Sequence, residues 1–368
     1  MYLRTLSVVN FKNIREALID CSPRLNTFIG DNGAGKTNLL DALYSLSFSK
    51  SYFTSVDQLN ILHEEDYFIL QGKYSRNGEE DTIVYGFRNG QKKQLKRNGK
   101  LYKRMTEHIG YLPLVMISPS DAQLITGGSE ERRKFMDGVI SQFSMEYLND
   151  LLRYNRVLVQ RNNLLRQSFT TGFVDEEMIP VYDEELVACG ERLYKARREF
   201  VEKLIPVFQR YYSFISGDDE RVGLSYLSDL NEAVFADLLS SSRKKDLAVQ
   251  FTTAGIHKDD LQLMLEGYPL KKLGSQGQQK SYLVALKMAQ FEFISSMSGL
   301  KPILLMDDIF DKLDKKRVEK IVRMVSAEQF GQIFITDTNR EHLDAILHDV
   351  TPDYRIFLVH KGQVTLVR

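Results

Sequence analysis

The sequence predicts an α/β fold with an antiparallel β meander in its N-terminal part and an inserted domain of long helices. The first observation is a Gly-x-x-x-x-Gly-Lys-Thr loop at residues 30–37, between an apolar run and a helical pattern. The second is the tripeptide Arg-Asn-Gly, which occurs three times between residues 76 and 99. The third is the helical spacing of apolar residues in the stretch 119–245.

The bulk composition is that of a soluble globular protein, with 43% hydrophobic and 27% charged residues over 368 residues. The formal net charge is zero, so contact with nucleic acid would depend on local basic patches. Basic residues near the N-terminus argue against a signal peptide, and the charge-free stretch 109–120 is too short to span a membrane. We expect a cytoplasmic protein without a membrane partner, in which Cys21 and Cys189 are core residues.

The loop at 30–37 has the context that phosphate binding requires. The segments "YLRTLSVVNF" and "RLNTFIG" read as strands, and "NLLDALYSL" from Asn38 reads as a helix. Glycines let the loop curl so that backbone N–H groups face a phosphate at the helix N-terminus. Lys36 would reach the β- and γ-phosphates and Thr37 would offer its hydroxyl to Mg²⁺. The predicted ATP-binding residues are Gly30, Asp31, Asn32, Gly33, Ala34, Gly35, Lys36, Thr37 and Asn38.

The three Asn-Gly pairs predict hairpin turns, because both residues tolerate positive φ. The last hairpin, residues 92–104 or "KKQLKRNGKLYKR", carries seven basic residues and no acidic one. This basic hairpin is either a ribbon that contacts a DNA backbone or a solvated sheet edge that discourages aggregation. We favour DNA contact through Lys92, Lys93, Lys96, Arg97, Lys100, Lys103 and Arg104.

Two helices of about 25 residues each are predicted in the insertion, from the apolar stripes in residues 144–165 and 181–205. Each stripe is expected to be a core face, and the pair would form a compact helical arm. The expected core positions are Leu148, Leu151, Leu152, Leu158 and Leu165, then Leu186, Cys189, Leu193, Phe200 and Leu204.

Two aspartates follow a predicted buried strand, Ile303 to Met306. The carboxyl end of such a strand is where ligands bind in α/β folds. Asp307 is placed to hold Mg²⁺, and Asp308 points elsewhere and could polarise an attacking water. The alternative is that both aspartates only cap the next helix.

A second anion-binding turn comes shortly before that strand, in "LGSQGQQKSYLVALKMAQ". A Ser-x-Gly-Gln turn opens a helix there, with Ser275 and the backbone of Gly277 as donors. One nucleotide does not need two such cradles in one chain. Together with the first loop and the aspartate pair, this turn resembles the signature of the ATP-binding cassette (ABC) superfamily. The resemblance implies an ABC-type P-loop ATPase head and an ATP-dependent, head-to-tail homodimer. Ser275, Gly277 and Gln278 would act on the partner's nucleotide, and Asp308 and Lys36 would be catalytic.

Within that superfamily the chain resembles the RecF family of SMC-related DNA-repair ATPases, collinearly over essentially its whole length. The motifs are "LSVVNFKNI", "GDNGAGKTNLLDALY", "SPSDAQLITGGSEERRKFMDGVI", "YNRVLVQRNNLL", "GIHKDDL" and "GSQGQQKSYLVALKMAQ". The resemblance implies residues 1–118 and 246–368 as the two parts of the ATPase lobe and 119–245 as the arm. Asp314, in "DKLD", would belong to a loop that crosses the dimer interface.

The function implied by the resemblance is an ATP-dependent DNA clamp in recombinational repair. Such proteins bind duplex DNA beside single-stranded gaps, work with RecO and RecR, and help load the RecA recombinase. ATP binding would close the dimer on DNA, and slow hydrolysis would release it.

Three departures from the family pattern stand out. Ser49, Lys50 and Phe53 replace a usual glycine and two arginines, which removes an expected arginine contact. Ile256 and Lys258 replace proline and arginine, so neither His257 nor Lys258 is given a role. After "QIFIT", residues 337–338 are Asp-Thr, without the switch histidine of transporter ATPases.

Two alternative functions follow from other relatives of the same fold. One alternative is the ATPase of an SMC-like or nuclease-associated DNA-repair system. A fused nuclease domain would need a further carboxylate cluster, for which the 29 residues after "TDTN" are too few. A transporter subunit would need the missing histidine and a membrane permease.

Overall fold

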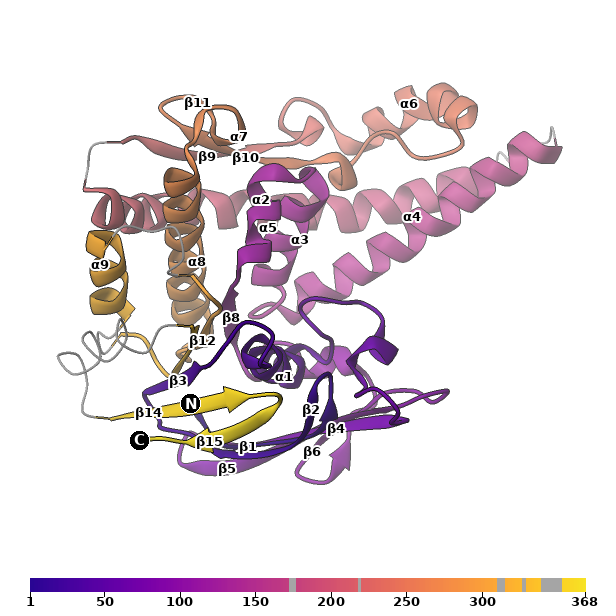
Figure 1. The fold of residues 1–368 in the computed structure, drawn as a ribbon. Coiled ribbons are helices and arrows are strands. Elements are labelled where there is room, and N and C mark those ends of the chain that lie inside the picture. Colours follow the sequence, from indigo (N-terminus) through magenta and orange to yellow (C-terminus); the bar gives the residue numbers. More distant parts are fainter. Residues whose placement is uncertain (172–176, 218–219, 310–314, 326–328, 339–352) are drawn as a thin grey trace. The chain divides into compact units, whose positions relative to one another are not determined.

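The computed structural model describes residues 1–171, 177–217, 220–309, 315–325, 329–338 and 353–368 (Figure 1). The chain divides into two compact units. The first unit comprises Met1–Asp121, Phe214–Ser216 and Lys280–Arg368, and the second comprises Ala122–Ser213 and Gly217–Gln279. The functional division at residues 118 and 245 stays a prediction.

An antiparallel sheet of six strands forms one layer of the first unit, in the order β2-β1-β4-β5-β6-β7. Its hairpin turns carry the predicted Asn-Gly pairs, with φ of 52° at Asn77 and 49° at Asn98. The predicted β meander is therefore confirmed. The strands are β1 (Tyr2–Phe11), β2 (Ile14–Asp20), β4 (Tyr67–Arg76), β5 (Glu79–Arg88), β6 (Gln94–Arg97) and β7 (Lys100–Leu101).

A second six-stranded sheet has the order β15-β14-β3-β13-β12-β8. Its strands β14, β3, β13, β12 and β8 run parallel, so their carboxyl ends share one edge. The strands are β3 (Leu25–Ile29), β8 (Leu114–Ile117), β12 (Ile303–Met306), β13 (Ile333–Asp337), β14 (Tyr354–His360) and β15 (Gln363–Leu366). The predicted strands at 303–306 and around residue 27 are confirmed.

Helix α1 (Lys36–Phe48) packs between the meander and this mainly parallel sheet. Its leucines at 39, 40, 43 and 46 are buried, as the helical spacing predicts. Phe28 of β3 lies 6.2 Å from Phe334 and 5.5 Å from Phe357, measured between ring centroids. Helix α9 (Lys315–Val325) completes the described part of the first unit, and α8 (Gln276–Ser298) contains the boundary between the units. Leu283, Leu286 and Met288 of α8 are buried, as predicted.

The second unit contains two long antiparallel helices, α4 (Met145–Thr171) and α5 (Met178–Ser216) (Figure 1). The predicted length of about 25 residues fits α4, which has 27, but is wrong for α5, which has 39 and continues through Pro206. The predicted core stripe of α5 is fully buried. In α4, Leu152 is 43% exposed, so its assignment to the core is wrong. Tyr154, Val157 and Arg161 are buried instead, so these three residues lie on the buried face of α4 and Leu152 does not.

A small antiparallel sheet and four further α-helices belong to the described part of the second unit, and the sequence did not predict the sheet. Its order is β11-β10-β9, and β10 pairs with β9 over six residues. The elements are α2 (Gln123–Thr126), α3 (Ser129–Ile140), β9 (Val222–Leu227), α6 (Phe235–Val249), β10 (Asp260–Leu265), β11 (Tyr268–Pro269) and α7 (Leu270–Leu273). Of the helices that the structure describes, none is long and apolar enough to cross a membrane.

Two buried arginines hold the second unit together. Arg161 of α4 is fully buried and its guanidinium is 2.7 Å from the carboxylate of Asp246 and 2.6 Å from that of Asp183. Arg197 of α5 is 2.9 Å from Asp137 and 3.2 Å from Asp259. Buried charges are tolerated only when paired and hydrogen-bonded, so these arginines join α4 and α5 to α3, α6 and the segment before β10.

Both ring nitrogens of His257 are hydrogen-bonded to other residues of the second unit. Its Nε2 lies 3.0 Å from the carbonyl oxygen of Thr252 and its Nδ1 lies 2.9 Å from the Tyr154 hydroxyl. A carbonyl can only accept, so Nε2 carries the proton and Nδ1 accepts from Tyr154. Burial lowers the pKa of His257 to about 4. Lys258 lies over the ring of Phe251, with 5.0 Å between its nitrogen and the ring centroid.

The pKa of His257 predicts a loss of stability in mild acid. An unfolded histidine takes up a proton below its ordinary pKa of roughly 6.5, whereas folded His257 does so only near pH 4. The stabilising contribution of neutral His257 to folding is therefore fully present above pH 6.5, and it is lost progressively as the pH drops toward 4. Between pH 7 and pH 5 we expect His257 to cost about 2 kcal/mol of unfolding free energy. Urea titrations of His257→Gln should show a smaller acid loss than those of the unchanged protein. His63→Gln, at an exposed site, is the control, and an equal loss in all three proteins would contradict the prediction.

Candidate nucleotide-binding site

The predicted phosphate loop lies between the carboxyl end of β3 and the first turn of α1. Gly33 and Gly35 have φ of 79° and 116°, conformations that other residues seldom adopt. Ala34, Gly35 and Lys36 are buried, while Asp31, Asn32 and Gly33 are exposed. The loop therefore has the strand–loop–helix geometry that presents backbone N–H groups to an anion.

Lys36 lies inside the curve of this loop. Its Nζ donates to the carbonyl oxygens of Gly30, at 2.8 Å, and Asp31, at 3.1 Å. The side chain is almost fully buried. An ammonium group held at the mouth of a helix N-terminus favours a bound phosphate, because both sources of positive charge act on the same ligand.

Thr37 and Asp307 meet although they are 270 residues apart in the chain. The Thr37 hydroxyl donates to the Asp307 carboxylate at 2.9 Å. Thr336, at the end of β13, donates to the same carboxylate at 2.8 Å. Burial raises the pKa of Asp307, against the hydrogen bonds from Thr336 and Thr37, which lower it. A hydroxyl and a carboxylate side by side are hard oxygen ligands of the kind that Mg²⁺ prefers.

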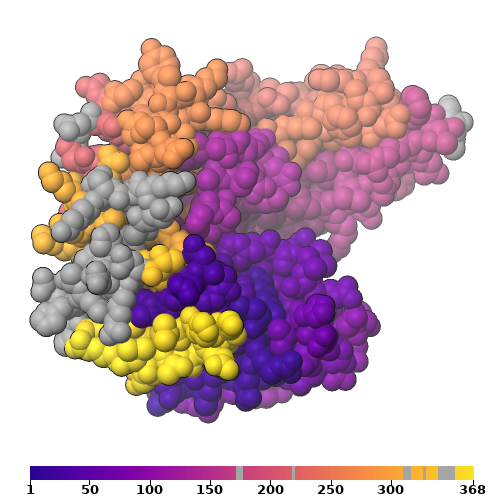
Figure 2. Space-filling view, in the orientation of Figure 1, coloured from indigo at the N-terminus to yellow at the C-terminus, as the bar shows by residue number. Residues whose placement is uncertain are grey.

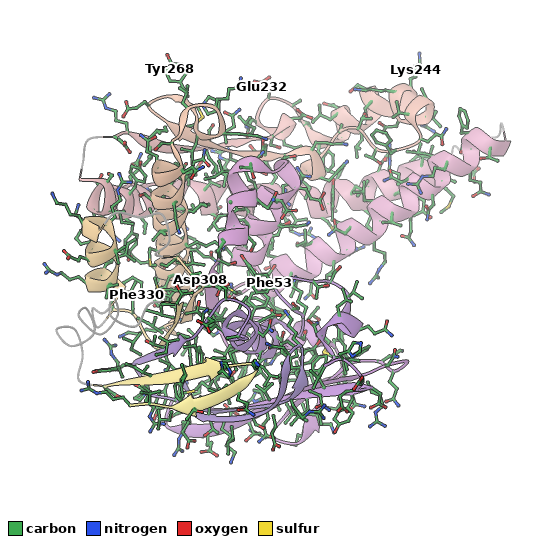
Figure 3. The ribbon with its side chains drawn as sticks, viewed as in Figure 1. Phe53, Glu232, Lys244, Tyr268, Asp308 and Phe330 are labelled. Carbon is green, nitrogen blue, oxygen red and sulfur yellow. The ribbon has the colours of Figure 1, made fainter. Side chains whose placement is uncertain are left out.

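Asp308, which Figure 3 labels, follows Asp307 directly in the chain. It adopts a positive φ of 42°, which is uncommon for a residue other than glycine. Its backbone N–H donates to the Thr336 hydroxyl at 3.0 Å. Thr336 thus contacts both aspartates, and it was not among the residues predicted from the sequence. Its neighbours in the chain carry no motif, so only the pairing of β13 beside β12 reveals it.

The predicted signature residues open helix α8 in the second unit. Gln278 N–H donates to the Ser275 hydroxyl at 3.3 Å, and the Gln278 side chain accepts from Ser275 N–H at 2.7 Å. This reciprocal arrangement is a capping box, which fixes the first turn of a helix. Gln278 also donates to Glu220 at 2.7 Å. Ser275, Gly277 and Gln278 are therefore assembled at one helix N-terminus. Asp314 lies outside the described residues.

Ser49 and Phe53, which differ from the usual residues of the family pattern, have well-defined surroundings in the first unit. Ser49 ends helix α1 with φ of 52°, a left-handed conformation for which glycine is preferred. Phe53 lies beside Lys12, with 5.2 Å from the lysine nitrogen to the ring centroid. Lys12 is also 2.5 Å from the buried carboxylate of Asp41. This corner of the first unit is therefore organised by an aromatic ring and an ion pair.

The seven cations of the basic hairpin do not all have the same environment. Arg97 pairs with Asp81 at 3.3 Å and lies over the ring of Tyr111, and Lys93 pairs with Asp57 at 3.3 Å. Four of the other five line two open hollows of about 410 and 450 Å³. Lys92 and Lys96 line the first, whereas Lys100 and Lys103 line the second together with Glu107. Arg104 is exposed.

The fold and this site define a class of protein, the P-loop nucleotide-binding head with a helical insertion. The family of the RecF/RecN/SMC N-terminal domain matches residues 2–364. The DNA replication and repair protein RecF of Bacteroides thetaiotaomicron is 52% identical over 365 residues, covering 99% of this chain and 98% of that protein. RecF of Flavobacterium johnsoniae is 48% identical, covering 97% of this chain and 99% of that protein. The chain belongs to the RecF family.

Solved structures agree with this assignment. A structure of the recombination mediator protein RecF with ATP, from the RecFOR pathway, has a TM-score of 0.90 and 30% identity. The match covers 100% of the present chain and 98% of the chain in the RecF structure. An Smc head bound to the C-terminal winged-helix domain of ScpA has a TM-score of 0.61 at 14% identity, a likeness of fold alone. The predicted fold class, including the inserted helical arm, is confirmed.

Proposed function

We propose that this protein is an ATP-dependent DNA clamp of recombinational repair, which dimerises when it binds ATP. The observation that carries the proposal is the contact between Thr37 and Asp307, which joins the phosphate loop to the carboxyl end of β12. Such a junction is what binding of a nucleoside triphosphate with a metal ion requires. Membership of the RecF family, with a relative solved in complex with ATP, supports the choice of nucleotide.

In this proposal the site residues of the first unit have separate tasks. The N–H groups of residues 33–37 bind the phosphates, and Lys36 neutralises their charge. Thr37 and Asp307 fit Mg²⁺, which when bound would neutralise charge on the phosphate oxygens. Asp308 accepts a proton from the attacking water. Hydrolysis acts as a slow switch, so the protein is a weak ATPase.

The homodimer explains why the chain carries a second helix N-terminus at Ser275. In the proposed arrangement, Ser275, Gly277 and Gln278 of one subunit contact the nucleotide held by the other. Two ATP molecules then lie between two subunits, and their hydrolysis releases the dimer. DNA is held while the dimer is closed. The family's role suggests duplex and gapped DNA as ligand, RecO and RecR as partners, RecA as the recombinase that is loaded, and the cytoplasm as location.

The test is the mass of Asp308→Asn by light scattering, with and without ATP and Mg²⁺, alone and with a short duplex. Asparagine keeps the shape of the side chain but cannot take up the proton, so the ATP-bound state should accumulate. We expect a dimer only with ATP, and tighter duplex binding in the same condition. A monomer under every condition would contradict the proposed clamp. Asp66→Asn, at an exposed aspartate, is the control.

The basic hairpin is proposed to contact the DNA backbone, and salt dependence tests this. Each lost phosphate contact should flatten the slope of log affinity against log salt by about 0.9 on duplex DNA. Charge reversal at Lys92 and Lys96 should therefore reduce the slope, and so should reversal at Lys100 and Lys103. The comparison also reports which of the two hollows faces DNA. Lys73→Glu, on the outer face of β4, is the control, and an unchanged slope in both pairs would make the hairpin a solvated edge.

A further inference from the structure

The outward-facing carbonyl groups of the phosphate loop need hydrogen-bond donors. A loop whose N–H groups converge on a ligand must turn its C=O groups to the other side. A carbonyl that rotated inward would instead present partial negative charge to a phosphate. The conformation of the loop therefore depends on what holds the carbonyls of Gly33 and Ala34.

Asn13, in the turn between β1 and β2, supplies one of these donors. Its Nδ2 lies 3.2 Å from the carbonyl oxygen of Ala34 and 3.4 Å from that of Gly33. The other end of the same amide, Oδ1, accepts from the Asn38 side chain at 2.7 Å. Because Asn38 belongs to the first turn of α1, this bond orients the amide so that its NH₂ group faces the loop.

The turn of the C-terminal hairpin, between β14 and β15, supplies the second donor. Gly362 N–H donates to the Ala34 carbonyl at 2.9 Å. The turn has no spare room, because a Cβ atom at Gly362 would lie 2.2 Å from the carbonyl oxygen of Asn13. A Cβ atom at Gly30 would lie 2.1 Å from the carbonyl oxygen of Val359. Figure 2 shows the C-terminal residues, in yellow, against N-terminal residues in indigo.

We propose that Asn13 and the Lys361–Gly362 turn form a positioning clamp on the Ala34 peptide. The clamp holds this carbonyl from two sides and so keeps the adjacent N–H groups directed at the phosphates. Neither element touches the reacting atoms, so both are positioning elements. The C-terminal hairpin thereby becomes part of the nucleotide site, although it carries no phosphate-binding motif. This inference rests on the proposed binding of ATP at the loop.

The test compares three variants by equilibrium ATP binding and by thermal melting without nucleotide. Asn13→Ala removes one donor, and Gly362→Ala displaces the other. Gly78→Ala is the matched control, because Gly78 lies in a similar hairpin turn with φ of 85°, against 79° for Gly362, and has open space around it. The backbone strain of an alanine is then comparable in the two turns, and only one of them contacts the loop.

We expect Asn13→Ala and Gly362→Ala each to weaken ATP binding about tenfold or more, the usual effect of losing one well-placed hydrogen bond. Gly78→Ala should lower the melting temperature without changing ATP affinity by more than about twofold. If Gly362→Ala does not fold, Asn13→Ala alone decides. Unchanged affinity in a folded Asn13→Ala protein would overturn the clamp. Absence of ATP binding by the unchanged protein would instead overturn the proposed function, and the clamp with it.

Discussion

Replacing Lys36 by methionine should weaken ATP binding by about a hundredfold, the effect of removing a charged hydrogen-bond donor from a phosphate. Methionine is close to lysine in length and apolar, so it fills the same buried space without the charge. Equilibrium binding of ATP with Mg²⁺ measures the effect. Dimerisation and ATP-dependent DNA binding should be lost together with nucleotide binding, because the proposed clamp closes only on ATP.

Lys73→Met is the control for this prediction. Lys73 is exposed on β4, so the substitution removes the same charge from the protein without touching the loop. It should leave ATP affinity within about twofold of the unchanged value. If Lys36→Met bound ATP as tightly as the unchanged protein, the assignment of the loop as the phosphate site would be wrong.

Replacing Arg161 by methionine should destabilise the second unit by about 3–5 kcal/mol. Arg161 and Asp246 are both fully buried, and loss of the guanidinium leaves the Asp246 carboxylate buried without its cation. Thr253 would still donate to Asp246 at 2.6 Å, but a neutral hydroxyl does not compensate the charge. Chemical unfolding, followed by circular dichroism, measures the change.

Arg192→Met is the matched control on the neighbouring helix. Arg192 makes a bidentate contact with Asp150, at 2.6 and 2.7 Å, but its side chain is 50% exposed. An exposed pair of this kind contributes up to about 1 kcal/mol. Equal losses for Arg161→Met and Arg192→Met would show that burial does not set the strength of these pairs. The double variant Arg161→Met, Asp246→Leu should be more stable than Arg161→Met alone, because it also removes the buried Asp246 carboxylate that has lost its cation.

Elements with a local sequence signal could be predicted. Asn-Gly pairs predicted the turns of the meander, because asparagine and glycine adopt positive φ more readily than most residues. The leucine spacing in α1 and the apolar run before Asp307 likewise predicted a helix and a strand. In each case the information lies within about ten neighbouring residues.

Features that depend on distant neighbours could not be predicted. The apolar stripe predicted a helix that ends near residue 205, but α5 continues through Pro206 to Ser216. Burial of Phe208, Tyr212 and Ile215 beyond the proline offsets its cost to the helix. Leu152 fits the helical spacing, yet its face of α4 is solvated while the charged Arg161 is buried. Asn13 and Thr336 became visible as site residues only when β1 and β13 were placed beside the loop and the aspartates.

The position of β3 at the centre of its sheet has a consequence for how the protein is made. Residues 25–29 pair on one side with β13, residues 333–337, and on the other with β14, residues 354–360. The phosphate loop leaves the ribosome early, but both neighbouring strands of β3 are among the last residues synthesised. β3 therefore stays unpaired during synthesis until residues 333–360 have been made, and the second unit can fold in that interval. Long-range pairing of this kind is also slow. A chain that ends prematurely before residue 354 leaves one edge of β3 open and lacks the Gly362 N–H that donates to Ala34 of the phosphate loop.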